Sequence, residues 1–523
     1  MKKIFYILSV FLVMSSCNDA LDIVQDGEIN DPQTAFQTVE DMQKFLNGSV
    51  YPSVDPLNEI NFTSLFTDEI GFGPAGVSTT DILTHRWVLN STSGDAAAIW
   101  VSNYNIINKA NILLNGSKLI DFNTLSPANQ ALYTSILVHT RALRAYAYIN
   151  LESYFSPNMK DANALGVMLA TEPADLFETK LPRVKNSEIF ALIESDLQYA
   201  LTNFNSTSVA STTITATGQF RDFHYLLKPA IHAMAARYYN YKGDDANAKV
   251  NATTAITSST INLALPNTTA VATSYQRMWE DAAGSRGEIL WSLYRPNSST
   301  GSWSNIANLW TTNSTDINGS VNFDMSRKLY TLLNQLPGTD VRGQVFVDAS
   351  SQFDAFYPNG ANPREADVIV INKYPGKPAP LASATMQLRN DIKIFRLSEM
   401  YLILAEVAVH EGNLTTAATR VRTIRGTRSV GGLAATITYT SAQQAYADIL
   451  LERRRELSFE GHRYVDLKRM GVAAGVGIDR DVYDDDNSTM PLTLPASDYR
   501  FTLPIPLSEM NANSNVQQNP GYN

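Results

Sequence analysis

The feature that most constrains this chain is a helical spacing of apolar residues that recurs along it. Ser126 and Pro127 have the form of a helix start, a capping side chain followed by proline in the first turn. Apolar residues then return every three, four or seven positions, at Leu132, Ile136, Leu143, Ala147 and Leu151. A second such segment starts near Asn186 and places on one face Ile189, Leu192, Ile193, Leu197, Ala200 and Leu201. The spacing predicts a mostly α-helical protein.

Two later segments share one design, a helix, a glycine turn and a shorter alanine-rich helix. Residues 224–256 turn at Gly243, and residues 395–425 turn at Gly412. Small residues that would let the paired helices approach closely are Ala233, Ala236, Ala405, Ala408, Ala417 and Ala418. The design resembles tetratricopeptide-type hairpins. Because the two copies lie far apart, we expect an irregular helical solenoid rather than a tandem array.

The segments between the helices differ in composition. Residues 257–325 are rich in Ser, Thr and Asn and hold four of the six tryptophans. Within them GEILWSLYR alternates apolar residues and predicts a strand, and VIVINKY, residues 368–374, predicts another. The proline-punctuated residues 503–522 are expected to be extended. The predicted fold class is therefore mostly α, with loop-rich insertions and a few short strands.

The N-terminus has the form of a lipoprotein signal. Lys2 and Lys3 precede an apolar run that is too short to span a bilayer. Met14-Ser15-Ser16-Cys17 resembles a bacterial lipobox, which implies cleavage before Cys17 and acylation of that cysteine. The alternative is an ordinary secreted protein with a chance cysteine. Because Cys17 is the only cysteine, we expect no disulfide.

These patterns predict one large body behind a leader. We expect residues 1–16 to be a signal peptide and residues 17–35 to be the lipidated cysteine and a tether. The body is then 36–523. It divides into a helical part at 36–256, a loop-rich ligand-site insertion at 257–390, and a helical part with an extended tail at 391–523. The formal net charge of −10, with no long basic run, argues against a nucleic-acid partner.

A set of motifs, taken in order, resembles the SusD/RagB family of Bacteroidetes outer-membrane lipoproteins. After the lipobox come TDEIGF, WVSNYNIINKANILL, RALRAYAYINLESYF and LPRVKNSEIFALIESDLQYAL. The C-terminal half adds FRLSEMYLILAEVAVHEGN, ERRRELSFEGHRYVDLKRMG and LPIPLSEMNANSNVQQNPGY. The resemblance spans nearly the whole chain.

This resemblance implies a lipid-anchored, non-enzymatic protein on the cell surface, with the outer membrane as its location. Such proteins cap a SusC-like TonB-dependent transporter and capture glycans, or peptides in the RagB branch. It also implies a helical SusD-like fold that presents a ligand site on irregular segments.

The charged stretch LLERRRELSFEGHRYVDLKRMG, residues 450–471, could be an acid/base active site or a structural network. Its glutamates follow one helix face and have arginines three or four positions away. Arginine neighbours lower a carboxyl pKa, which disfavours a general acid. We therefore predict a structural ion-pair network of Glu452, Arg453, Arg455, Glu456, Glu460, Arg463 and Asp466.

Motifs for catalysis or cofactors are missing from the sequence. No HExxH, GxSxG, Walker or GxGxxG pattern occurs, so we expect no catalytic residue, no metal and no cofactor. The acidic run from Asp479 to Ser488 lacks EF-hand spacing and is interpreted as a solvated loop, with calcium as the alternative.

Aromatic residues in polar loops are the positive indication of a ligand site. A tryptophan beside Asn and Ser can stack on a sugar ring while amides bind its hydroxyls. The predicted ligand-binding residues are Trp303, Trp310, Tyr294, Trp87, Trp100, Asn103, Asn297 and Asp68. The alternative is that these aromatic residues fill small cores.

Three functions remain open on the sequence. The first is a glycan-binding lipoprotein that delivers oligosaccharide to a SusC-like transporter. The second is a RagB-like peptide receptor, with a less aromatic cavity that recognises backbone. The third is a surface glycoside hydrolase, which requires a carboxylate pair outside the arginine network.

Overall fold

The structure, a computed structural model, describes most of the chain after its first 34 residues. The described residues are 35–174, 180–210, 221–266, 269–295, 306–311, 320–335, 339–353, 367–377, 388–432, 434–486 and 489–522. Cys17, Asn297 and Trp303 lie outside them.

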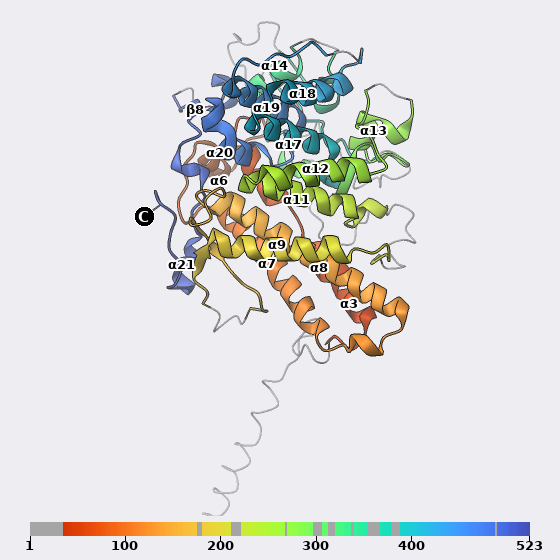
Figure 1. Ribbon diagram of the computed structural model, residues 1–523. Coiled ribbons are helices and arrows are strands. Elements are labelled where there is room, and N and C mark those ends of the chain that lie inside the picture. Colours follow the sequence, from red (N-terminus) through yellow and green to blue (C-terminus); the bar gives the residue numbers. More distant parts are fainter. Residues whose placement is uncertain are drawn as a thin grey trace, which may run out of the picture.

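Helices dominate the N-terminal part of the protein (Figure 1). They are α3 (Val39–Phe45), the π-helix η1 (Leu46–Val50), α4 (Tyr51–Ser53), α5 (Leu57–Phe66), α6 (Thr79–His85), α7 (Gly94–Ser117), the 3₁₀-helix η2 (Phe122–Thr124), α8 (Pro127–Phe155), α9 (Asn186–Asn203), the 3₁₀-helix η3 (Asp222–His224), α11 (Lys228–Lys242) and α12 (Asp245–Ser258).

Shorter helices fill the central segment, and longer ones return towards the C-terminus. They are the 3₁₀-helix η4 (Val271–Thr273), α13 (Tyr275–Trp279), the 3₁₀-helix η5 (Ile306–Leu309), α14 (Arg327–Leu333), α15 (Val341–Phe346), α17 (Leu397–His410), α18 (Leu414–Arg428), α19 (Ala442–Leu457), α20 (Arg463–Ala474), the 3₁₀-helices η6 (Val482–Asp484) and η7 (Tyr499–Phe501), and α21 (Leu507–Ala512).

The predicted helix starts and turns are present. Ser126 accepts a hydrogen bond from the Asn129 backbone N–H at 3.3 Å and caps α8. Gly243 ends α11 with φ of 81°, and Gly412 follows α17 with φ of 74°. Both backbones are left-handed, a conformation that glycine adopts without the strain of a Cβ.

Neighbouring helices form one continuous array. α7 packs on α8, α8 on α9, α9 on α11, α11 on α12, α12 on α17, α17 on α18 and α19, and α19 on α20. Figure 1 shows this succession from α7 and α8 at one end to α18 and α19 at the other. The six predicted small residues are all buried between these helices, which permits their close approach. The predicted mostly α solenoid with paired helices is confirmed.

Strands within the described residues are short and form two-stranded antiparallel pairs. The pairs are β1 (Ile70–Phe72) with β5 (Phe323–Met325), β2 (Leu165–Met168) with β3 (Arg183–Lys185), β4 (Ile289–Leu293) with β6 (Ile392–Arg396), and β7 (Ile478–Asp479) with β8 (Thr493–Leu494). β4 matches the predicted GEILWSLYR strand. The strand prediction for residues 368–374 was wrong, because this segment makes only isolated bridges, Val368 with Gln352 and Ile371 with Val347.

The C-terminal segment, predicted to be extended, contains the short helix α21 and returns to the N-terminal helices. The Leu507 N–H donates to the Ser91 carbonyl, which places the start of α21 beside the loop before α7. Figure 1 shows α21 near α7 and α9, away from α18 and α19. Among the described residues, no helix has the length and apolar character needed to cross a membrane.

Candidate functional site

An open cleft lies along α7, with α21 and the segment around Met168 as its other walls. Its volume is about 440 Å³, within the range of small-molecule sites, about 300–1,000 Å³. The α7 wall presents Trp100, Tyr104, Asn108 and Asn111, which are spaced by three or four residues and therefore share one helix face.

The aromatic part of the cleft is packed from behind. The Trp100 and Tyr104 rings lie 4.8 Å apart, and Trp100 makes an edge contact with Phe155 at 4.9 Å. Trp100 is only 2% exposed, whereas Tyr104 is half-buried. Tyr104 therefore offers more ring surface to the cleft than Trp100 does.

The same residues hold the facing segment in place. Tyr104 Oη donates to the Met168 carbonyl at 3.0 Å and accepts from the Met168 N–H at 2.8 Å. Asn111 Nδ2 donates to the carbonyls of Ala170 and Glu172, at 3.1 and 3.0 Å. These bonds fix the cleft wall without any ligand, so the site is largely preformed.

The α21 wall contributes acceptor oxygens. Trp100 Nε1 donates to Glu509 Oε2 at 3.4 Å, and Asn513 Nδ2 donates to Glu509 Oε1 at 3.3 Å. Asn513 Nδ2 also donates to the carbonyl of Leu181, which lines the cleft, at 2.8 Å, and so ties the end of α21 to that wall. Because a carboxylate has about four acceptor positions, Glu509 keeps some for a ligand.

Amide donors line the mouth of the cleft. Asn105 is exposed, and Asn108 accepts from the Ala174 N–H through Oδ1 at 2.9 Å, which leaves its Nδ2 for a ligand. Glu172 and Lys180 complete the polar rim. An aromatic wall beside amides and a carboxylate suits a polyhydroxylated ligand, because the ring packs on C–H groups while the polar groups bind hydroxyls.

The structure does not bring the sequence-predicted ligand residues to one surface. Trp100 lines the cleft, and the next-turn neighbour Asn103 is buried, donating to Glu59 Oε1 at 2.7 Å. Trp87 is 3% exposed and donates through Nε1 to the Phe66 carbonyl at 2.8 Å.

The remaining described residues of that set lie elsewhere. Trp310 is 4% exposed and stacks on Tyr374 at 5.9 Å between centroids. Tyr294 is half-buried, with its ring 5.1 Å from that of His224. Their roles in ligand binding stay predictions.

Asp68 lines a second, larger cleft of about 710 Å³ beside α19. Its carboxylate is buried and accepts from Arg463 at 2.9 and 3.0 Å. Burial alone would raise the pKa of Asp68, but the charges of Arg454 and Arg463 outweigh it and hold the pKa well below its usual range. With both oxygens bonded to arginine, Asp68 serves this wall as a structural anion.

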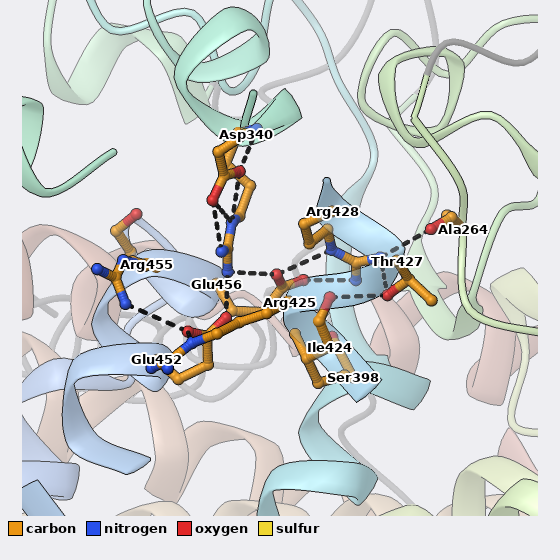
Figure 2. A network of polar contacts seen from close by, with 12 residues as sticks. Ala264, Asp340, Ser398, Ile424, Arg425, Thr427, Arg428, Glu452, Arg455 and Glu456 are labelled. Atoms are coloured by element: carbon orange, nitrogen blue, oxygen red, sulfur yellow. Dashed lines mark hydrogen bonds and ion pairs between the residues drawn. The ribbon is translucent and has the colours of Figure 1, made fainter. Parts of the chain in front are cut away.

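The 450–471 stretch forms a buried ion-pair network that joins many elements (Figure 2). Glu456 accepts from Arg396 at 2.7 Å, from Arg428 at 2.8 Å and from Arg342 at 3.2 Å. Other pairs of the stretch include Glu452 with Arg342, Arg425 and Arg455, Glu460 with Arg396 and Lys373, Arg453 and Arg469 with Asp466, Arg454 and Arg463 with Asp68, and Arg469 with Glu406.

The expected pairing along the helix itself is a minor part of this network. Only Arg455 with Glu452, at 3.4 Å, is an i,i+3 pair within α19. Burial opposes the ionisation of Glu452, but Arg342 and Arg425 outweigh it and lower its pKa to about 2. A carboxyl with so low a pKa stays ionised at neutral pH and cannot supply the proton of a general acid.

Of the residues that line the cleft, sequence reasoning found only Trp100 and missed those on which the site depends most. Tyr104, Asn105 and Asn108 lie within the motif that begins at Trp100, and their helical spacing could have indicated them. Glu509 is 409 residues away from Trp100, and no local pattern connects the two.

Comparisons with known proteins agree with one family. Residues 354–522 match the model of the SusD family. A segment of 155 residues is 31% identical to the starch-binding protein SusD of Bacteroides thetaiotaomicron, which amounts to 30% of this chain and 26% of that protein. The match thus spans about a quarter of that relative's length.

Solved structures extend the likeness to nearly the whole chain. A Bacteroides vulgatus protein described as sugar-binding superposes with a TM-score of 0.71 at 24% identity, covering 94% of this chain and all of that one. A SusD superfamily protein of Bacteroides thetaiotaomicron superposes with a TM-score of 0.71 at 22% identity, covering 92% of this chain and all of that one. At these identities the likeness shows the fold.

Proposed function

We propose that this chain, recognised as SusD/RagB-like by its C-terminal match and its fold, binds oligosaccharides without cleaving them, in the cleft along α7. The observation that carries the proposal is the combination of the half-buried Tyr104 ring with the Asn105 and Asn108 amides and the Glu509 carboxylate in one open cleft. The matched relative's name, starch-binding, supports a carbohydrate as the ligand class.

The proposed mechanism is capture. Tyr104 packs on the C–H face of a sugar, which is tolerant of sugar identity, and the amides and Glu509 select hydroxyl positions. The carboxylates of the 450–471 network are engaged by arginines, so they do not offer an acid/base pair to a glycan.

The proposed location and partner are those that the resemblance to SusD/RagB proteins implies. Acylated Cys17 anchors the chain to the outer membrane at the cell surface, and the bound oligosaccharide passes to a SusC-like transporter. Replacing Cys17 by Ala should abolish incorporation of labelled fatty acid and release the protein from the membrane fraction. Incorporation that persists in the Cys17→Ala variant would contradict the anchor, and failure to co-purify a TonB-dependent transporter from wild-type cells would contradict the partner.

The ligand proposal is tested by isothermal titration of residues 18–523 with a panel of plant, host and fungal oligosaccharides and with mixed peptides. Asn105→Ala and Glu509→Gln should each weaken glycan binding about 2- to 10-fold, the effect of one lost hydrogen bond of about 0.5–1.5 kcal/mol. Asn123→Ala, an exposed amide on η2 away from the cleft, should leave the affinity unchanged.

Three other results of these titrations would each change the proposed function in a different way. Loss of binding in Trp303→Ala alone would move the site from the cleft to the 257–325 insertion. Binding of peptides but not of glycans would favour the RagB-like receptor. A cleavage product in the titrated mixture would overturn non-catalytic capture.

A further inference from the structure

A small cavity lies where the end of α8, the loop at 157–160, α11 and α20 meet. Its volume is about 80 Å³, and Lys160, Lys468, Arg469 and Tyr241 line it. One water needs about 10–15 Å³ measured in this way, so the cavity has room for several waters or one small polyatomic ion.

Lys468 is held in place by α8 and, in its ammonium form, has a spare donor. Its Nζ donates to the carbonyls of Ser153 and Ser156, at 2.8 and 2.7 Å, and so caps the C-terminal end of α8. An ammonium has three N–H donors, so one remains for a ligand in the cavity. Capping thus explains the position of Lys468 but does not use its full donor capacity.

The charge of Arg469 is already balanced. Its guanidinium pairs with Glu406 and, at 3.0 Å, with Asp466, while Arg453 also pairs with Asp466 at 2.6 Å. The Arg469 guanidinium lies over the Tyr241 ring, 5.1 Å from its centroid. The two arginines and two carboxylates offset one another, which leaves the lysines to set the charge of the cavity.

Among the described residues no ion pair joins Lys160 or Lys468 to a carboxylate, and Glu406 and Asp245 act on Lys160 only from farther away. Glu152 acts on Lys468 from farther away, and its Oε1 accepts from the Val167 N–H. Burial lowers the pKa of Lys468 to about 7 and lowers that of Lys160 as well. An anion between them would favour both ammonium forms.

We propose that this cavity is a binding site for a small oxyanion such as sulfate or phosphate, held by the ammonium groups of Lys160 and Lys468. Lys160 lines the cavity with part of its side chain and is otherwise exposed to solvent, so the rim of the cavity is accessible. The ion could be free in solution or be a sulfate or phosphate group on a larger molecule, and both present the same oxygens. The site is separate from the α7 cleft, so failure of glycan binding there would leave this proposal unaffected.

The test is isothermal titration of the soluble protein with sodium sulfate and with sodium phosphate, at an ionic strength held constant with sodium chloride. Wild type should bind saturably, and Lys160→Met should weaken binding at least about 10-fold. Lys249→Met removes an exposed lysine that pairs with Glu411 and does not line the cavity, so it should bind as wild type does. Crystals soaked in selenate should show an anomalous selenium peak between Lys160 and Lys468.

Lys468→Met also removes the α8 cap and can fail to fold, so the Lys160→Met comparison decides the question. Absence of saturable binding and of a selenium peak in wild type would overturn the proposal, as would equal affinities of wild type and Lys160→Met. A sulfated oligosaccharide that binds more tightly than both inorganic sulfate and its desulfated form would support the site and identify a glycan as the source of the anion.

Discussion

At the residue scale, the network around Glu456 shows what a buried charge requires. Its carboxylate meets Arg342, Arg396 and Arg428, and all four side chains are at most 1% exposed. A buried charge without its partner is costly, so each member depends on the others. Through Glu456 the network thus links α19 to three other elements, α15, β6 and α18.

Replacing Glu456 by Gln should lower the free energy of unfolding by about 3–5 kcal/mol, because three buried arginines then share one carboxylate fewer. Urea unfolding followed by circular dichroism measures the change. Glu411→Gln, which breaks the exposed pair with Lys249, should cost at most about 1 kcal/mol. Equal losses in the two variants would show that the network does not depend on its buried charge.

Glu59 makes the free energy of unfolding fall as pH rises. Carboxylates that are paired with arginine and have a lowered pKa have the opposite effect. Burial raises its pKa to about 7, while the Asn103 hydrogen bond opposes the shift. A raised carboxyl pKa means that the folded state binds the proton more tightly than the unfolded state. The tighter proton binding at Glu59 therefore stabilises the folded state fully below about pH 4.5, and this stabilisation is lost as pH rises towards 7.

Replacing Glu59 by Gln keeps the shape of the side chain and removes the titration. Relative to wild type, the Gln variant should gain about 2–3 kcal/mol in the free energy of unfolding between pH 5 and pH 8. Urea unfolding of both proteins at the two pH values measures the difference. Parallel pH profiles would contradict a raised pKa at Glu59.

At the element scale, the paired helices depend on glycine where the chain turns. Gly412 has φ of 74°, and a Cβ added there would meet no atom within 4 Å. A substitution at this position therefore tests backbone conformation alone, without steric contact. Gly48 is a matched position, because it also has open space but lies in a helical segment without positive φ.

Gly412→Ala should lower the free energy of unfolding by about 1–2 kcal/mol, the cost of a left-handed residue with a Cβ. Gly48→Ala should be neutral or stabilising by up to about 1 kcal/mol, since alanine restricts the unfolded chain. The midpoints of thermal unfolding compare the two. A shift of the same sign in both variants would remove the conformational argument.

Local elements were predictable because their signals are local. The Ser126-Pro127 start, the Gly243 and Gly412 turns and the strand around Trp291 each depend on a few neighbouring residues. Partners distant in sequence were not predictable: Glu456 pairs with Arg342, which is 114 positions away, and Trp100 meets Glu509, which is 409 positions away. Composition indicated an aromatic site, but periodicity could not show which tryptophans are buried, and Trp87 and Trp310 are.

At the scale of the whole molecule, the C-terminal tail closes the helical array by returning to its beginning. Asn519 is 1% exposed and donates to the carbonyls of Phe155 and Leu503, at 2.9 and 2.7 Å. Its Oδ1 accepts from Arg183 at 3.0 Å. One side chain thus joins the end of α8, β3 and the tail that carries α21, the wall of the α7 cleft.

Replacing Asn519 by Ala should leave two buried carbonyls and an arginine donor without this partner and lower the free energy of unfolding by about 2–4 kcal/mol. Because α21 is held by the same tail, glycan affinity should fall too, although Asn519 does not line the cleft. Hydrogen exchange should increase in residues 503–522 before it increases in α17. Asn515→Ala removes one exposed bond to the Lys180 carbonyl and should change stability by less than about 1 kcal/mol. If Asn519→Ala loosened the tail without weakening glycan binding, α21 would not be part of the site, and the ligand would have to be held by α7 and the segment around Met168 alone.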